Sequence, residues 1–339
     1  MDPSTPEPPS LPPEVPTTPD FQKAGFWRRV GAFLIDSIIL GIVGWILGFF
    51  FADAFIRMGG WERLIGFGIA ALYFVPLNGR LGRGQTVGKR ALGIRVVSKM
   101  GLPLGIGRSF ARSVVLMLPH FLNGAPIPMW LLISGGGILI AEAIFGLGLS
   151  ILYLIVFNAR TRQSLHDLVV GSYVVRVGSE AADKPRIWAG HYVVVAAILI
   201  AAALVPLLLA PLMKIWLPKD MMAAYEAIQG EPEVASAQVV AGQSFFWDTQ
   251  KGQRVVTGVT VSVRLNRRIQ NHEEEAKKLA RILLEKYPDA ATKDSITITM
   301  AEGYDLGIAS WFYRQGFSFS PEQWRERLEA AGPAPTPTP

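Results

Sequence analysis

The sequence contains no cysteine among its 339 residues. This absence excludes disulfide bonds, thiolate metal sites and cysteine-based catalysis, and it leaves the redox compartment open. Charge is also scarce, because 18% of the residues are charged, whereas ordinary soluble domains carry roughly 25%. The missing charges are concentrated in several long uncharged stretches, which is the pattern of a membrane protein.

Basic and acidic residues divide unevenly along the chain. Residues 1–216 carry 19 Lys and Arg against 11 Asp and Glu, whereas residues 217–339 carry 14 against 16. The basic excess lies in short loops between apolar stretches, where Lys and Arg set membrane orientation or contact anionic headgroups. We therefore expect the lipid bilayer and its anionic headgroups as partners of these loops, and no nucleic acid.

The two ends of the chain have the composition of disordered tails. Residues 1–20 contain eight prolines and no Lys or Arg, and residues 332–339 are mostly Pro and Thr. The N-terminal segment lacks the basic and apolar regions of a cleaved signal peptide. The first apolar helix is therefore expected to remain in the mature protein.

The apolar stretches predict five membrane spans. Phe33 to Ala52 is long enough to cross a hydrocarbon core of about 30 Å. Its thirteen Phe, Leu, Ile and Val residues favour insertion by roughly 4 to 8 kcal/mol, against at most about 3 kcal/mol for its one Asp. Leu64 to Leu77 forms a shorter second span, and residues 113–157, interrupted by Pro and Gly, suit two more. Ile187 to Trp216 is the fifth, with a kink expected at Pro206.

Two basic loops give the orientation. Residues 79–112 carry eight Lys and Arg and no acid, and residues 158–186 carry five against three acids. The positive-inside rule places both loops, and with them the N-terminus, in the cytoplasm. Five crossings then put residues 217–331 on the extracytoplasmic side. If one half of residues 113–157 is re-entrant, that segment is cytoplasmic instead.

Residues 217–331 predict a small α+β domain, and about 115 residues suffice to bury a core. Alternating apolar residues at Ala235–Phe246 and Arg254–Leu265 indicate a hairpin across Asp248–Gly252. Asn271 to Tyr287 has a capping residue, an acidic first turn and an amphipathic pattern, all typical of a helix. The other expected elements are a helix at Lys219–Ile228, strands at Ser295–Met300 and Gly307–Phe319, and a helix at Pro321–Ala330. The predicted fold class is an all-α multi-pass membrane domain followed by this α+β extramembrane domain.

Two carboxylates fall inside the predicted spans, Asp36 in the first and Glu142 in the fourth. An acid in the hydrocarbon region is a functional candidate by default. Arg29 lies at the mouth of the first span on the same face as Asp36 but about 10 Å away along the axis, so a direct pair stays open. Gly44 and Gly48 offer a close-approach face to another helix, either as ordinary packing or as a dimer seam.

The short motifs in the loops do not match known phosphate-binding or metal-binding patterns. Gly84 to Arg90 lacks both the glycine spacing and the hydroxyl after the lysine that a phosphate-binding loop needs. The dipeptide His166-Asp167 has no metal-ligand spacing, and Asp167 is expected to cap the following segment or to pair with a loop arginine. Residues 91–97 resemble residues 169–175, which is either a pair of cytoplasmic strands or chance. No catalytic arrangement, cofactor site or metal site is predicted, so we do not expect an enzyme.

Three motifs together resemble the RDD family of bacterial and archaeal membrane proteins. They are Arg29-x-x-Ala32-x-x-x-Asp36, Gly84-Gln85-Thr86-x-Gly88-Lys89-Arg90-x-Leu92-Gly93, and Gln163-x-x-His166-Asp167. The resemblance covers about residues 21–178 and leaves residues 179–216 as a linker with the fifth helix. It implies a multi-pass domain in a bacterial inner membrane, with Arg29, Asp36 and Asp167 as the family arginine and aspartates. It also implies a transport role, since some members look like sodium–proton exchangers.

Two functions follow. In the first, Asp36, with Glu142, lines a path for a small cation, a proton or a proton-coupled ligand. In the second, the core does not transport, and it anchors an extracytoplasmic binding or sensor domain whose partner is another protein or a second copy of the chain. In that case Arg29, Asp36 and Asp167 hold the helices together.

Overall fold

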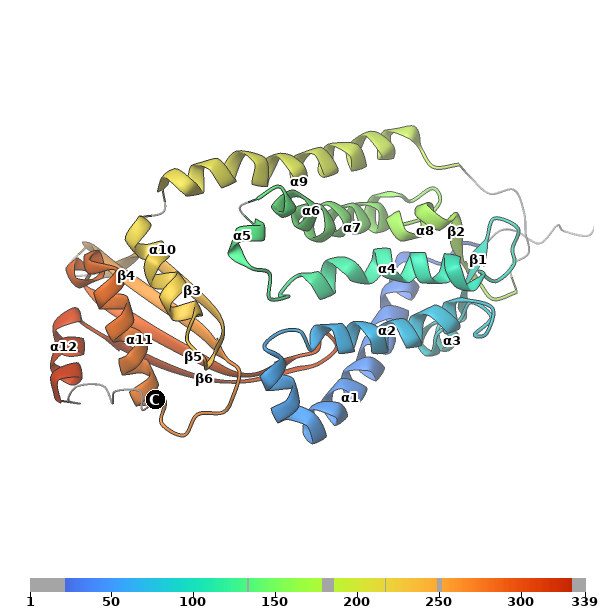
Figure 1. Ribbon diagram of the computed structural model, residues 1–339. Coiled ribbons are helices and arrows are strands. Elements are labelled where there is room, and N and C mark those ends of the chain that lie inside the picture. The colour runs from blue at the N-terminus through green and yellow to red at the C-terminus, as the bar shows by residue number, and fades with distance from the viewer. Residues whose placement is uncertain (1–21, 133, 179–185, 217, 249–251, 331–339) are drawn as a thin grey trace, which may run out of the picture.

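The computed structural model describes residues 22–132, 134–178, 186–216, 218–248 and 252–330. The predicted tails at residues 1–20 and 332–339, and the tip of the predicted turn at Asp248–Gly252, lie outside these residues. The chain forms a helical core, which runs from α1 to α9, and an α+β domain, which runs from α10 to α12 (Figure 1). The core has two ends. We call the end with the short sheet of residues 94–98 and 172–176 the sheet end, and the end next to the α+β domain the domain end.

The long helical stretches of the core run between these two ends (Figure 1). They are α1 (Phe26–Met58), α2 (Arg63–Asn78), α4 (Ile106–Leu122), the stretch of α6 (Gly136–Ala141), η1 (Glu142–Gly146) and α7 (Leu147–Phe157), and α9 (Ala189–Trp216). The short α5 (Met129–Leu132) lies in the interruption predicted within residues 113–157. α1 is longer than its apolar stretch, and it is capped by Gly59, whose φ of 61° is readily adopted by glycine.

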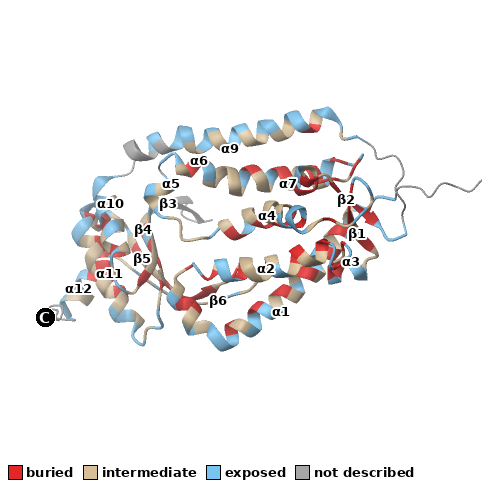
Figure 2. Cartoon of the chain, turned by 45° about the vertical axis from the view of Figure 1, so that its right-hand side comes forward, coloured by how far each residue is buried: buried red, intermediate tan, exposed pale blue. Residues whose placement is uncertain are grey.

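Among the described residues, three helices are long and apolar enough to cross a membrane. These are Phe26–Met58, Gly136–Phe157 and Ala189–Leu209. α2 has 16 residues, and α4 has 17 with two arginines in its first half, so the five-span count stays a prediction. Most apolar side chains of α9 are exposed (Figure 2), as expected of a helix that faces lipid.

The sheet end adds a β element to the core, so the predicted all-α class is incomplete. β1 (Ile94–Ser98) pairs antiparallel with β2 (Ser172–Arg176). The likeness between residues 91–97 and 169–175 therefore reflects two paired strands. The short helices α3 (Val87–Ala91) and α8 (Leu165–Val170) precede these strands and bring the two sequence motifs to this end.

The α+β domain matches its predicted elements closely. It consists of α10 (Lys219–Gln229), β3 (Val234–Asp248), β4 (Gly252–Leu265), α11 (His272–Lys286), the 3-10 helix η2 (Pro288–Thr292), β5 (Ser295–Asp305), β6 (Ser310–Phe319) and α12 (Pro321–Ala330). The strand order is β3-β4-β5-β6, and only the β4–β5 pair of this sheet is parallel, because α11 provides the crossover. Leu279, Ile298 and Trp324 belong to its buried core.

The β5–β6 hairpin extends beyond the sheet and enters the helical core (Figure 1). β5 continues to Asp305, five residues past its predicted end at Met300. Leu306 at the hairpin tip is fully buried and packs with Phe55 and Tyr304. The predicted helix-facing role of Gly44 and Gly48 is therefore wrong. A Cβ on Gly44 would meet Ile308 and Ala309, and one on Gly48 would meet Tyr304, so both glycines make room for this hairpin.

Candidate functional site

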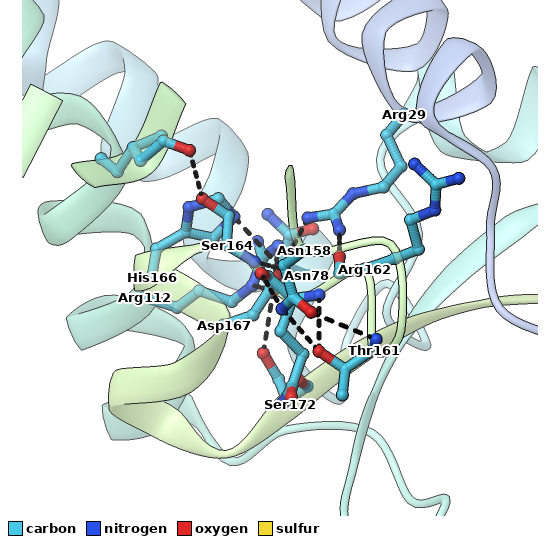
Figure 3. Close-up of polar contacts among 12 residues, drawn as sticks. Arg29, Asn78, Arg112, Asn158, Thr161, Arg162, Ser164, His166, Asp167 and Ser172 are labelled. Atoms are coloured by element: carbon cyan, nitrogen blue, oxygen red, sulfur yellow. Dashed lines mark hydrogen bonds and ion pairs between the residues drawn. The ribbon is translucent and has the colours of Figure 1, made fainter. Parts of the chain in front are cut away.

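Asp167 is the centre of a buried ion-pair network at the sheet end (Figure 3). Its side chain is fully buried. One oxygen lies 2.5 Å from Arg29 Nη2, and the other accepts from Arg112 Nε and Nη2 at 3.0 and 2.8 Å. Ser172 also donates to Asp167 at 3.1 Å. The network thus joins α1, α4, α8 and β2 through one carboxylate.

Asp167 also caps its own helix. It forms a reciprocal capping box with Ser164, whose backbone N–H donates to the carboxylate at 3.2 Å. Burial alone would raise the pKa of Asp167, but the charges of Arg112 and Arg29 outweigh it and hold the pKa well below its usual range. The two roles predicted for Asp167, capping and pairing, are therefore both present.

Arg29 does not pair with Asp36, which settles the question left open by their spacing. Its guanidinium binds Asp167 and also donates to the carbonyl of Arg162. Asp36 instead accepts three hydrogen bonds from neutral donors. These donors are Tyr73 Oη at 2.6 Å, Thr86 Oγ1 at 2.6 Å and the Gly88 backbone N–H at 2.8 Å. Asp36 therefore fastens α1 to α2 and to α3.

The loop motif Gly84-Gln85-Thr86-x-Gly88-Lys89 has a packing explanation in this contact. A Cβ on Gly88 would collide with the Ala32 carbonyl and with Asp36, so only glycine lets α3 lie directly against α1. Gly84 has a φ of 79° and lies against the backbone of Val96. Gln85 Nε2 donates to the Ile94 carbonyl at 3.0 Å. The motif therefore positions α3 and β1 beside the first helix.

Lys89 and His166 are two buried side chains of this region whose pKa values are lowered. Lys89 Nζ donates to Asn78 Oδ1 at 2.8 Å and lies 3.4 Å from Thr86 Oγ1, and both of these oxygens are neutral. Burial, followed by the charge of Arg112, lowers the pKa of Lys89 to about 7. Burial also lowers the pKa of His166 to about 3, although Asp167 opposes this shift. His166 is therefore a neutral imidazole at physiological pH.

A cavity of about 360 Å³ brings four of the predicted residues together. Arg29, Asp36, Lys89 and His166 all line it, together with apolar side chains of α1, α4 and α7. Arg112 lines it as well. Arg112 belongs to the basic stretch of residues 79–112 that we expected to face the cytoplasm, but it is 3% exposed. Its i,i+4 spacing with Arg108 gave no signal of burial, because the partner Asp167 lies 55 residues away.

Glu142 is not part of this group. It begins the π-helical turn η1, which packs against α9, and it does not line the cavity that contains Asp36. π-helical turns are often found at functional sites, but here no contact brings the two intramembrane acids together. Within the described ranges, no cluster of three or more His, Asp or Glu side chains has the arrangement of a metal site.

Comparison with known proteins finds a family match for the part of the chain that contains these motifs. The model of the RDD family matches residues 23–171. We call these matched residues the RDD core. The chain is also similar to YckC, an uncharacterized protein of Bacillus subtilis, with 27% identity over 154 residues, which are 45% of this chain and 85% of YckC. No solved structure matches the chain significantly. Arg29, Asp36 and Asp167, the arginine and aspartates of the three motifs, all lie within the matched range.

Proposed function

We propose that this protein is a multi-pass membrane protein whose RDD core anchors and orients the α+β domain as a binding or sensing module. The observation that carries this proposal is the insertion of the β5–β6 hairpin into the RDD core. A domain tethered only through α9 would be free to rotate relative to the core, whereas the inserted hairpin fixes its orientation. We assign no catalytic role to either part.

The contacts around the hairpin support a fixed docking. Arg63 Nη2 lies 2.6 Å from Asp305 Oδ2, and the Asp305 N–H donates to Glu62 Oε1 at 2.9 Å. Glu62 is fully buried and also pairs with Arg264 of β4. Deeper in the core, His120 Nε2 lies 2.6 Å from the Gly307 carbonyl. These bonds satisfy polar groups of the tip where water is scarce.

The RDD residues support the same proposal, because each has a structural partner. Asp36 holds α3 in place and Asp167 joins four elements. In this role Asp36 is expected to affect folding and not a flux. The basic loops lie at the sheet end, so by the positive-inside rule we place this end in the cytoplasm. The α+β domain then lies on the extracytoplasmic side of a bacterial inner membrane, where it would bind a protein partner or a second copy.

A disulfide between the hairpin and α1 tests this docking. The chain has no cysteine, so engineered pairs report without background. A Cβ on Gly44 would lie 2.8 Å from the Ala309 Cβ, close enough for a disulfide after a small shift. We expect Gly44→Cys with Ala309→Cys to cross-link in native membranes. The control pair, Gly68→Cys with Ala309→Cys, should not, because a Cβ on Gly68 has no neighbour within 4 Å in the described residues. Equal cross-linking of the two pairs would contradict a fixed docking.

Transport is the second candidate, and one observation favours it. A neighbouring cavity of about 240 Å³ shares Phe33, Phe74 and Leu116 with the cavity at Asp36 and ends at Gly307 and Ile308 of the hairpin. The hairpin would then plug the domain end of a path. Lys89, with its pKa of about 7, would be a proton-exchanging group beside Asp36. Ion-dependent flux in vesicles that is lost in Asp36→Asn, at normal folded yield, would favour transport over anchoring.

A further inference from the structure

The cavity at Asp36 has a polar part and a long apolar wall. Its lining on α1 runs from Phe26 to Asp36, which is about 15 Å along a helix at 1.5 Å per residue. α7 forms the facing wall with Gly148, Ile151, Leu152 and Ile155. Phe33 and Leu152 are 50% and 58% exposed, so the cavity reaches the outer surface of the helices between α1 and α7. In a bilayer, this mouth faces lipid.

The charges around the cavity do not balance. Arg29, Lys89 and Arg112 are three cationic side chains that line it, and Asp36 and Asp167 are the two carboxylates bound in the same region. Asp167 is shared by the two arginines, and Asp36 is occupied by neutral donors. When Lys89 is protonated, its two hydrogen-bond partners, Asn78 and Thr86, are both neutral. Buried charges are normally paired, so one further negative charge would complete this cluster.

His166 provides a separate indication of a ligand. Its side chain is 4% exposed and lines the cavity. Its Nδ1 atom is buried and has no hydrogen-bond partner among the described residues. Buried polar atoms are nearly always hydrogen-bonded, and a neutral imidazole nitrogen can donate to or accept from a ligand oxygen. A ligand with polar oxygens would satisfy this atom.

We propose that this cavity binds an anionic phospholipid that carries a single negative charge on its headgroup. The lipid would enter between α1 and α7 from the bilayer, with its phosphate near Lys89, Arg112 and His166 and an acyl chain along the apolar wall. The volume of about 360 Å³ lies within the usual range for small-molecule sites, roughly 300–1,000 Å³. A zwitterionic lipid would not supply the missing charge, and free phosphate would leave the apolar wall uncovered.

The test compares three probes on the full-length protein. Delipidated protein in a neutral detergent is titrated with phosphatidylglycerol, phosphatidylcholine or inorganic phosphate, and the thermal unfolding midpoint and the bound lipid by native mass spectrometry are recorded. We expect phosphatidylglycerol to raise the midpoint and to remain bound as one copy per chain. An equal effect of phosphatidylcholine would overturn the proposal. An equal effect of inorganic phosphate would overturn it in favour of a small anion.

Two variants and their matched controls locate the binding site. Lys89→Gln should weaken phosphatidylglycerol binding by about tenfold, the value of one charge-assisted hydrogen bond. Arg28→Gln, which removes a positive charge from the same end without lining this cavity, should not. Leu152→Trp fills the mouth and should also reduce binding, whereas Leu139→Trp, at a 74% exposed position of α6, should not. Wild-type affinity in both Lys89→Gln and Leu152→Trp would overturn the proposal. If one of these variants folds poorly, wild-type affinity in the other would still overturn it.

Discussion

Two buried polar clusters hold the molecule together, one at each end of the helical core. One connects elements within the core, and the other connects the core to the α+β domain. The cluster around Asp167 joins α1, α4, α8 and β2 within the helical core. The cluster around Glu62 joins this domain to the appended α+β domain through Arg264 and Asp305. In both, a fully buried carboxylate binds more than one partner. The difference indicates that the first cluster is needed for the core to fold and the second for the two parts to dock.

Asp167→Asn should have the largest effect. The substitution leaves Arg29 and Arg112 buried without their counter-charge, and breaking a buried pair costs about 3–5 kcal/mol. We expect the folded yield of the full-length protein, measured by size-exclusion chromatography in detergent, to fall severely. A normal yield and a normal unfolding midpoint for this variant would show that the Asp167 cluster is not needed for the core to fold.

Glu62→Gln should have a smaller and more local effect. Arg264 is 15% exposed at its side chain, so water can partly replace its lost partner, and we expect a cost of about 1–3 kcal/mol on docking. The cross-link between Gly44→Cys and Ala309→Cys should form more slowly, while the yield of the folded core stays close to wild type. A loss of yield as large as that of Asp167→Asn would show that docking and core folding are one cooperative event.

Gly88→Ala probes the close approach of α3 to α1 beside Asp36, at the same end of the core as the first cluster. The added methyl group collides with the Ala32 carbonyl, and overpacking of this kind costs about 1–3 kcal/mol. The matched control is Gly105→Ala at the start of α4, where a Cβ meets no described atom within 4 Å. The unfolding midpoint in detergent should fall for Gly88→Ala and stay nearly constant for Gly105→Ala. Equal midpoints for the two variants would contradict the packing explanation of the loop motif.

The pH dependence of stability tests the environment of Lys89. Its pKa is lowered to about 7 in the folded protein, whereas an unfolded lysine titrates near 10.4. Between these values the unfolded state binds a proton that the folded state has lost, so stability rises with pH. In lipid-free protein, the unfolding midpoint of wild type should rise from pH 7 to pH 9 relative to that of Lys89→Met. If the unfolding midpoints of the two proteins change with pH in parallel, then burial does not lower the pKa of Lys89 in the folded protein.

The sequence predicted the elements better than the contacts between them. Hydrophobic periodicity located the apolar helices and nearly every element of the α+β domain, because these patterns are local. The pairing of Arg29 with Asp167 and the hairpin insertion join residues more than 130 positions apart and leave no periodic signal. The end of β5 was predicted too early, at Met300, because Glu302, Gly303 and Asp305 are poor strand residues. In the structure, Glu302 accepts a hydrogen bond from the Ile269 N–H and Asp305 pairs with Arg63, which offsets that poor propensity.

The smallest effect is expected for Asp53→Asn at the domain end. Asp53 of α1 lies 2.8 Å from Arg268, so this pair also joins the core to the α+β domain, but the two side chains are 67% and 55% exposed. Exposed pairs contribute about 0–1 kcal/mol because water already solvates both charges. We therefore expect Asp53→Asn to leave the unfolding midpoint and the rate of the hairpin cross-link unchanged, in contrast to Glu62→Gln a few residues away. If Asp53→Asn slows the cross-link as much as Glu62→Gln does, then net charge at the contact would hold the domain, and burial of the Glu62 carboxylate would not be the deciding feature.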